Sequence, residues 1–250
     1  MKTTPVKTPL ILLFCSACLL HAQTQPPTFD AASLKPVATC NAPQDPQTGP
    51  GTLTIRGRTP LVLIQWAYDL PRSQVSGPPF LMENCFDLIA KGAGREDDAQ
   101  LRLMLRTLLA DRFGLKAHLE QREMQVYALT LAKGGPKFKE SPTDGPPTID
   151  RTNPVILSAH HMTLTEVGAR IADEVGRPVT DETGLTGRYE IRIDLSPYIA
   201  AAGTADAGKL DMMSILFTGL TEQLGLKLES RKSTVPILVI DHAEKSPTEN

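Results

Sequence analysis

One residue pattern occurs twice along the chain, and this repeat constrains the fold more than any other feature of the sequence. The matched segments are 61–68 with 164–171, 86–88 with 189–191, 114–116 with 225–227, and 124–131 with 235–242. The first two matches are 103 residues apart and the last two 111, so an insertion lies between them, near residues 200–208. A register kept over this length is typical of a duplicated structural unit. We therefore expect two copies of one fold.

Residues 97–135 show most clearly what each copy contains. Apolar residues recur at helical spacing from Leu101 to Phe113, which predicts an amphipathic helix that ends at Gly114. Two extended runs follow, 115–120 and 124–132, and the polar residues between them predict a hairpin. By the repeat, the runs 226–231 and 235–241 predict a second, final hairpin.

Local signals place the remaining elements. Thr59 before Pro60 starts a helix over residues 60–70, and Thr163 with Glu166 forms a capping box at the start of a second-half helix. Strands are expected at 29–37, 52–56, around Val75, and at 85–91, 155–159, 178–181 and 189–195. The predicted fold class is α+β, with two tandem βαββαββ repeats whose helices pack against small mixed or antiparallel sheets.

Proline- and glycine-rich stretches divide the chain. Residues 40–51, 134–153 and 200–208 are expected to be loops because they hold few apolar residues. The predicted organisation is a signal peptide at 1–22, repeat 1 at 28–136, a linker at 137–153, repeat 2 at 154–245, and a tail at 246–250.

The first residues resemble an export signal. Lys2 and Lys7 precede an apolar run at residues 10–20, and Ala22 is a small residue suited to cleavage. The run is too short to span a bilayer. We expect a periplasmic or secreted protein. Two alternatives are a buried N-terminal helix and lipoprotein processing at Cys18, which would attach the protein to a membrane.

Cleavage after Ala22 would leave two of the four cysteines, Cys40 and Cys85. In an oxidising compartment such a pair is most simply a disulfide, here closing a loop of 45 residues. Two separate buried thiols are the alternative. Cleavage would also leave 24 basic residues against 28 acidic ones, a balance that argues against a nucleic-acid partner.

No residues are assigned to catalysis, a cofactor or a metal. His160 and His161 are adjacent, so on a strand they would point to opposite faces, and no third ligand stands at a zinc-motif spacing. His118, Glu120 and Glu123 lie near the first expected hairpin tip, where an acid/base pair is conceivable. A cross-strand polar contact is the simpler interpretation.

Each repeat resembles the short N-terminal domain of secretins and TonB-dependent transducers. The residues that carry this resemblance are 163–179, 220–230 and 235–242. The resemblance implies two helices packed between small sheets.

Nearly the whole chain after residue 28 resembles a family of uncharacterised exported proteins of soil acidobacteria, which also occurs as a domain joined to BlaR1-type membrane metallopeptidases. The matching residues are 29–36, 108–113, His118 with Glu120, Tyr127, 132–137, 176–179, 183–189 and 239–245. Gln125, where the family tends to place proline, and the cysteine pair depart from the pattern. The resemblance implies no activity, cofactor or catalytic residue.

The expected function is that of an exported, non-catalytic interaction or signalling module of the cell envelope. Open sheet edges would accept a strand from an unknown envelope partner. The edges could instead be covered by the other repeat or blunted by Lys116 and Lys227. Alternative functions are a small-ligand carrier that binds between the repeats and a metal-dependent hydrolase that uses His160, His161 or His118.

Overall fold

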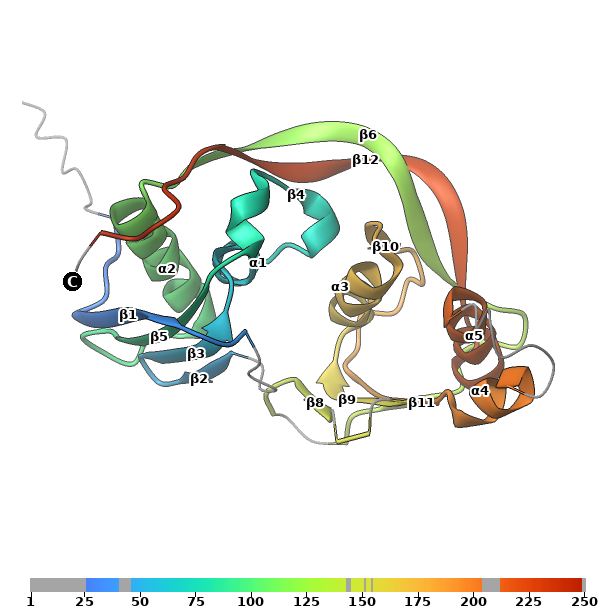
Figure 1. Ribbon diagram of the computed structural model, residues 1–250. Coiled ribbons are helices and arrows are strands. Elements are labelled where there is room, and N and C mark those ends of the chain that lie inside the picture. Colours follow the sequence, from blue (N-terminus) through green and yellow to red (C-terminus); the bar gives the residue numbers. More distant parts are fainter. Residues whose placement is uncertain are drawn as a thin grey trace, which may run out of the picture.

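A computed structural model describes residues 26–40, 46–142, 145–150, 152–153, 155–203 and 212–248. The predicted signal peptide and Cys18 lie outside these residues. The fold is α+β, as expected, and is divided into two lobes that a long two-stranded ribbon joins (Figure 1). Within the described residues, no helix is both long and apolar enough to cross a membrane.

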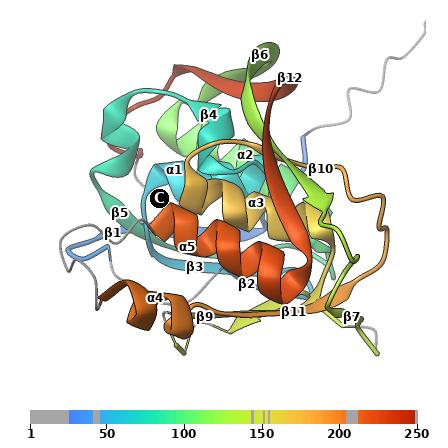
Figure 2. The same ribbon diagram turned by 90° about the vertical axis from the view of Figure 1, so that its right-hand side faces the viewer.

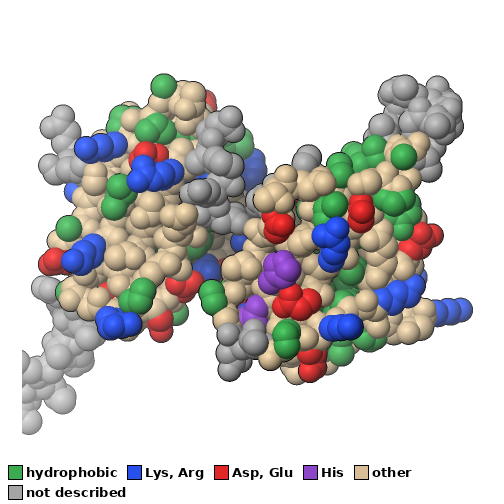
Figure 3. Space-filling model, turned by 90° about the horizontal axis from the view of Figure 1, so that it is seen from below, with side chains coloured by type: hydrophobic (Ala, Val, Ile, Leu, Met, Phe, Trp, Pro, Cys, Tyr) green, Lys and Arg blue, Asp and Glu red, His purple; other side chains and the backbone are tan. Residues whose placement is uncertain are grey.

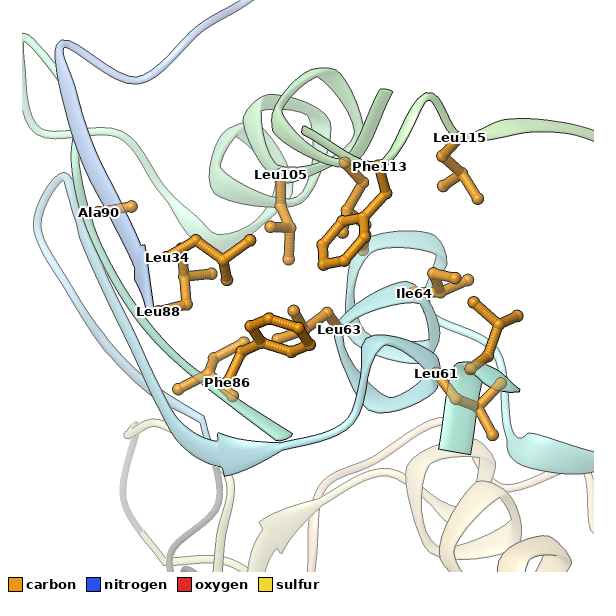
Figure 4. Close-up of a cluster of buried hydrophobic side chains, with 14 of the residues drawn as sticks. Leu34, Leu61, Leu63, Ile64, Phe86, Leu88, Ala90, Leu105, Phe113 and Leu115 are labelled. Carbon is orange, nitrogen blue, oxygen red and sulfur yellow. The ribbon is translucent and has the colours of Figure 1, made fainter. Parts of the chain in front are cut away.

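The first lobe packs two helices on one face of an antiparallel sheet. The sheet has the order β1-β5-β3-β2. In chain order, the elements of the first lobe are β1 (Ala31–Val37), β2 (Gln47–Gly49), β3 (Thr52–Arg58), α1 (Pro60–Tyr68), β4 (Val75–Ser76), β5 (Cys85–Lys91) and α2 (Asp98–Phe113), with 3-10 turns at Arg72–Gln74 and Pro79–Met82. Apolar side chains from the sheet point at the helices (Figure 4), and Phe86 meets Phe113 edge to face with ring centroids 5.4 Å apart.

Local chemistry fixes the ends of these helices. Asp97 and Gln100 form a capping box at the start of α2, and Gly114 ends the helix at φ 58°. Thr59 occupies the N-cap position of α1 but makes no side-chain capping bond. That helix ends at Tyr68, with Asp69 as its C-cap at φ 55°, two residues short of the predicted end at residue 70.

The second lobe has a sheet with the corresponding order, β7-β11-β9-β8. Its elements are β7 (Lys139–Glu140), β8 (Thr148–Asp150), β9 (Ile156–Met162), α3 (Leu164–Val175), β10 (Val179–Asp181), β11 (Tyr189–Asp194), α4 (Ser196–Gly203), α5 (Met212–Gly219) and a π-helical turn at Leu220–Leu224. The predicted capping box of Thr163 and Glu166 is confirmed. Two segments expected to be irregular contribute regular structure: 137–153 supplies the edge strands β7 and β8, and α4 includes residues 200–203.

The ribbon consists of β6 (Lys116–Leu131) and β12 (Leu226–His242). The two strands pair antiparallel over their whole length and run side by side over both lobes (Figures 1 and 2). β10 joins β6 at one end and β4 joins β12 at the other, both parallel, which gives the sheet order β10-β6-β12-β4.

The two predicted hairpins are therefore wrong. Each pair of extended runs is one continuous strand, and the expected tip residues 121–123 pair across the ribbon with residues 234–236. The physical reason is that Gln121, Arg122 and Glu123 include none of the glycine, proline or asparagine residues that a tight turn requires. They are polar because they lie on a two-stranded ribbon that is largely open to solvent.

The ribbon makes each lobe depend on the other half of the sequence. Leu238 and Ile240 of β12 belong to the core of the first lobe, and Leu129 of β6 belongs to the core of the second. A smaller cluster of Val126, Val235 and Ile237 is buried at the middle of the ribbon. Neither lobe encloses its core with its own half of the chain.

The ribbon register has the symmetry that a duplication would produce. Glu123 lies opposite Thr234, and these residues are separated by the repeat spacing of 111. β10 pairs at Tyr127 through Val179, and β4 pairs at the corresponding Leu238 through Val75. The duplication itself stays a prediction.

Leu238→Ala should test the dependence of the first lobe on the last strand. Leu238 is fully buried, so the cavity should lower the free energy of unfolding by about 2 to 5 kcal/mol. Leu119 pairs directly opposite it but is 59 % exposed, so Leu119→Ala should cost less than about 0.5 kcal/mol. Urea denaturation followed by circular dichroism measures both, and equal effects would contradict the packing described.

Candidate functional site

The sequence-predicted disulfide is present. Cys40 and Cys85 are bonded, with their Cα atoms 5.3 Å apart, and the bond ties the loop after β1 to the start of β5. Cys85 is buried. The bond therefore fastens the edge of the first sheet rather than forming part of an exposed reactive site.

His118 and Glu120 do not form an acid/base pair. His118 Nδ1 lies 2.8 Å from Asp241 Oδ2 across the ribbon, and both side chains are about half exposed. Glu120 instead accepts a hydrogen bond from Arg122 Nε at 2.9 Å. Glu123 lies 3.6 Å from Lys232. These are cross-strand and neighbouring polar contacts, as the simpler interpretation predicted.

The hydrogen bond that His118 donates to Asp241 raises the pKa of His118 above its ordinary value, and the charges of Asp241 and Glu120 act in the same direction. A histidine pKa that is raised by folding stabilises the folded state at low pH. That contribution is complete below the unfolded-state pKa of about 6.5 and is lost as the pH rises through the higher folded-state value.

Asp241→Asn should therefore lower the pKa of His118 toward about 6.5, because it removes both the hydrogen-bonded carboxylate and its charge. A proton NMR titration of the histidine ring signals measures the change. Glu244→Gln is the matched control, since Glu244 pairs with His242 at 3.0 Å and not with His118. A His118 pKa that is unchanged in the Asp241 variant would show that this pair does not form in solution.

The other sequence candidates, His160 and His161, meet a carboxylate on the second lobe. Glu190 of β11 is the centre of this polar cluster: its Oε2 lies 2.5 Å from His160 Nδ1, and its Oε1 accepts from Ser141 Oγ at 2.6 Å. The backbone N–H of His161 also donates to Glu190 Oε1, at 3.2 Å. Histidine side chains lie beside acidic ones on this face of the lobe (Figure 3).

This order of groups does not match a serine hydrolase. In a catalytic triad the histidine stands between the serine and the carboxylate, so that it can take the serine proton. Here Glu190 stands between Ser141 and His160, and the serine donates directly to the carboxylate. Those hydrogen bonds, Ser141 first and His160 second, hold the pKa of Glu190 below its ordinary range.

The two histidines also do not converge on a metal. His161 has a left-handed backbone, φ 57°, and its ring Nε2 accepts from Gly145 N–H at 3.3 Å. The side chain of His160 points instead at Glu190. No group of three or more histidine, cysteine or acidic side chains in the described part of the chain is arranged to hold a metal ion.

The first lobe contains the same arrangement with different side chains. Gly57 at φ 54° occupies the position that corresponds to His161, and its N–H donates to Asp87 Oδ1 at 2.7 Å. Arg56 lies 3.6 Å from Asp87, as His160 lies beside Glu190. In both sheets this site is a β-bulge. The histidine pair thus occupies a structural position whose counterpart carries no histidine.

A pair of substitutions tests this correspondence. A non-glycine residue in the left-handed region costs about 1 kcal/mol or more, so His161→Gly should raise the free energy of unfolding by about 1 kcal/mol. Gly57→Ala should lower it by a similar amount, for the same reason. Thermal and urea denaturation measure both. A clear loss of stability in His161→Gly would instead assign an essential role to the imidazole ring.

The outer edge of β11 is the other unusual feature of this lobe. In the first lobe, β1 pairs with every residue of β5, from Cys85 to Lys91. In the second lobe, β7 pairs only with Tyr189 and Glu190. No strand among the described residues pairs with Ile191–Asp194 on this side of the sheet.

A groove of about 430 Å³ lies beside this edge. It is lined by β7 and the chain on either side of it, by two residues of β11, and by the end of the π-helical turn: Lys137, Phe138, Lys139, Glu140, Pro142, Glu190, Arg192 and Leu224. Glu190 therefore belongs to both the polar cluster and the groove.

A family model described as "Protein of unknown function (DUF3738)" matches residues 62–243. The chain belongs to this family. The matched range of the DUF3738 chain begins within α1, after Cys40, and contains α2, the ribbon, the Glu190 cluster and the groove. No curated protein and no solved structure matches the chain.

The sequence of this DUF3738 chain pointed to the two histidines and to open sheet edges in general, but not to Glu190, Ser141 or the place of the open edge on β11. One signal was available: residues 86–88 match 189–191 in the repeat, which aligns Glu190 with Asp87 at the same acidic position. Ser141 lay in a segment that composition assigned to a linker. The open edge depends on strand pairing, which residue patterns do not report.

Proposed function

We propose that this DUF3738 protein is an exported interaction or signalling module of the cell envelope and not an enzyme. The observation that carries the proposal is the unfilled edge of β11, because an open edge beside a groove is a means of recognising an extended segment of another protein. Ser141 and His160, two of the polar side chains near this edge, are engaged in structural contacts with Glu190.

The sequence resemblances favour the same function. Short N-terminal domains of secretins and TonB-dependent transducers, and domains joined to BlaR1-type metallopeptidases, belong to envelope machines. On the sequence pattern, residues 1–22 direct export to the periplasm or beyond it. Processing at Cys18 is the alternative route to an envelope location.

The arrangement of the two lobes also suits a binding module. Two contacts help to hold their relative position. The backbone N–H of Arg72 donates to Asp173 Oδ1 of the second lobe at 2.8 Å, and Gln74 Nε2 donates to the carbonyl of Pro236 in the ribbon at 2.7 Å. A preorganised surface loses little entropy when it binds.

Crosslinking in the native envelope, followed by mass spectrometry, tests the proposal. The full-length chain should be recovered from the envelope or periplasmic fraction, crosslinked to a small set of envelope proteins. A chain with residues 1–22 deleted is the control, and it should remain in the cytoplasm and lose these crosslinks. Recovery without a partner, together with turnover of an envelope substrate that His160→Ala abolishes, would contradict the proposal and favour the hydrolase alternative.

A further inference from the structure

We propose that the outer edge of β11 at Arg192, between Glu190 and Asp194, is a vacant strand position that binds an extended partner segment with an acidic side chain beside apolar ones. This inference rests on the proposed function and names its site and the chemistry of its partner. The corresponding position in the first lobe is filled, because the start of β1 pairs there with Leu88–Lys91.

The chain itself leaves the position empty. If β7 continued backwards along β11, Phe138 and Lys137 would pair with Ile191 and Arg192. Instead, the backbone N–H of Lys137 donates to the carbonyl of Leu224 at 3.0 Å, and its Nζ donates to the carbonyl of Glu222 at 2.7 Å. The chain therefore turns away from the sheet onto the π-helical turn.

The backbone of β11 alternates between its two neighbours. The N–H of Leu195 donates to Val155 at 2.9 Å, and by the register Ile193 and Ile191 also face β9. Arg192 and Asp194 consequently turn their N–H and C=O groups to the outer edge.

The side chain of Gln223 already bonds the backbone of Asp194 at this edge, as a neighbouring strand would. Gln223 Oε1 accepts from the N–H of Asp194 at 2.9 Å, and Gln223 Nε2 donates to the Asp194 carbonyl at 2.7 Å. On the other side, Glu190 is paired with Lys139 of β7. Arg192 lies between these two filled positions, so its backbone N–H and C=O are the groups that an added strand would meet.

The groove walls define what such a strand should carry. Phe138 and Leu224 offer apolar contact for a side chain that points toward the core. Lys137, Lys139 and Arg192 supply positive charge, and none of them forms an ion pair with a carboxylate among the described residues.

The groove also contains two carboxylates, Glu140 and Glu190, which differ in how far they offset the positive charge. Glu190 is committed to Ser141 and His160, while Glu140 is exposed. Three cations and two anions line the groove, and the charge of Arg192 also acts on Asp150 and Asp194. Lys137 and Lys139 therefore carry most of the preference for an acidic segment.

A larger groove, of about 590 Å³, lies between the start of β1 and α2. It lies beside the start of β1, the edge strand of the first sheet, and its charged residues, Asp30, Asp111 and Arg112, favour no single partner. The edge of β11 is therefore the stronger candidate.

Binding of a labelled peptide to the full mature protein tests the inference. The probe is an acetylated and amidated peptide of alternating valine and glutamate, followed by fluorescence anisotropy. Binding should weaken at least about tenfold when the valines are N-methylated, because strand addition needs their N–H groups, and when lysine replaces glutamate. Lys139→Glu should have the same effect, whereas Arg170→Glu, on the exposed face of α3, should not.

Arg192→Pro is a second variant, which removes the edge N–H that the added strand would use. Its fold is checked by circular dichroism, and it should lose binding while keeping the native spectrum. Equal binding of the N-methylated or lysine peptide, tight binding only of a peptide with a free C-terminal carboxylate, or no binding at all would overturn the inference. If envelope crosslinks survive in Lys139→Glu and Arg192→Pro, the interaction function stands but uses another surface.

Discussion

The fold depends on the antiparallel pairing of β6 and β12. Each strand begins in one lobe and ends in the other. The end of β6 places Leu129 in the second core, and the end of β12 places Leu238 in the first. A two-stranded ribbon alone is only marginally stable in water. This one is stable because both ends are buried in lobes, and because Val126, Val235 and Ile237 are buried at its middle.

The pairing of β6 and β12 also explains how the two lobes are held at a fixed separation. A linker of coil would let the lobes move independently. Here the strands of the connection are paired from Lys116–His242 at one end to Leu131–Leu226 at the other. Arg72 adds a contact between the lobes, and Gln74 adds one between the first lobe and the ribbon. Any surface that involves both lobes is therefore preorganised.

The two bulges show how one architectural position tolerates different chemistry. Gly57 and His161 both adopt left-handed backbones and donate an N–H to a carboxylate on the neighbouring strand. In the first lobe that carboxylate faces an arginine, and in the second a histidine. The adjacent histidines that attract attention in the sequence are one version of a structural contact.

Much of the local structure could be predicted from the sequence because its causes are local. The capping box at Thr163 and the glycine that ends α2 act within one helical turn, and both were predicted correctly. The ribbon could not be predicted in the same way. Two extended runs on either side of Gln121–Glu123 look alike whether they pair with each other or with a strand 111 residues away, and only the second arrangement buries Leu129 and Leu238 in different cores.

The candidate site was predicted only in part for a related reason. The Cys40–Cys85 disulfide followed from counting cysteines, and the histidines were visible as a pair. The surroundings of Glu190 and the open edge of β11 depend on where β7 ends. β7 stops at Lys139 because the next residue toward the N-terminus, Phe138, packs on Tyr189 with ring centroids 5.1 Å apart, and Lys137 bonds to the π-helical turn. These contacts link segments that are distant in sequence.

Amide hydrogen exchange of the free protein, read residue by residue by NMR, is the most direct measurement of whether the β11 edge is vacant. Ile89 is the matched reference, because it holds the position of Arg192 in the first lobe and lies opposite Ser33 of β1. The amide of Arg192 should exchange much faster than that of Ile89, while Ile193, which faces β9, should be protected. Equal protection of Arg192 and Ile89 would show that the edge is already filled, and would contradict the proposed binding site.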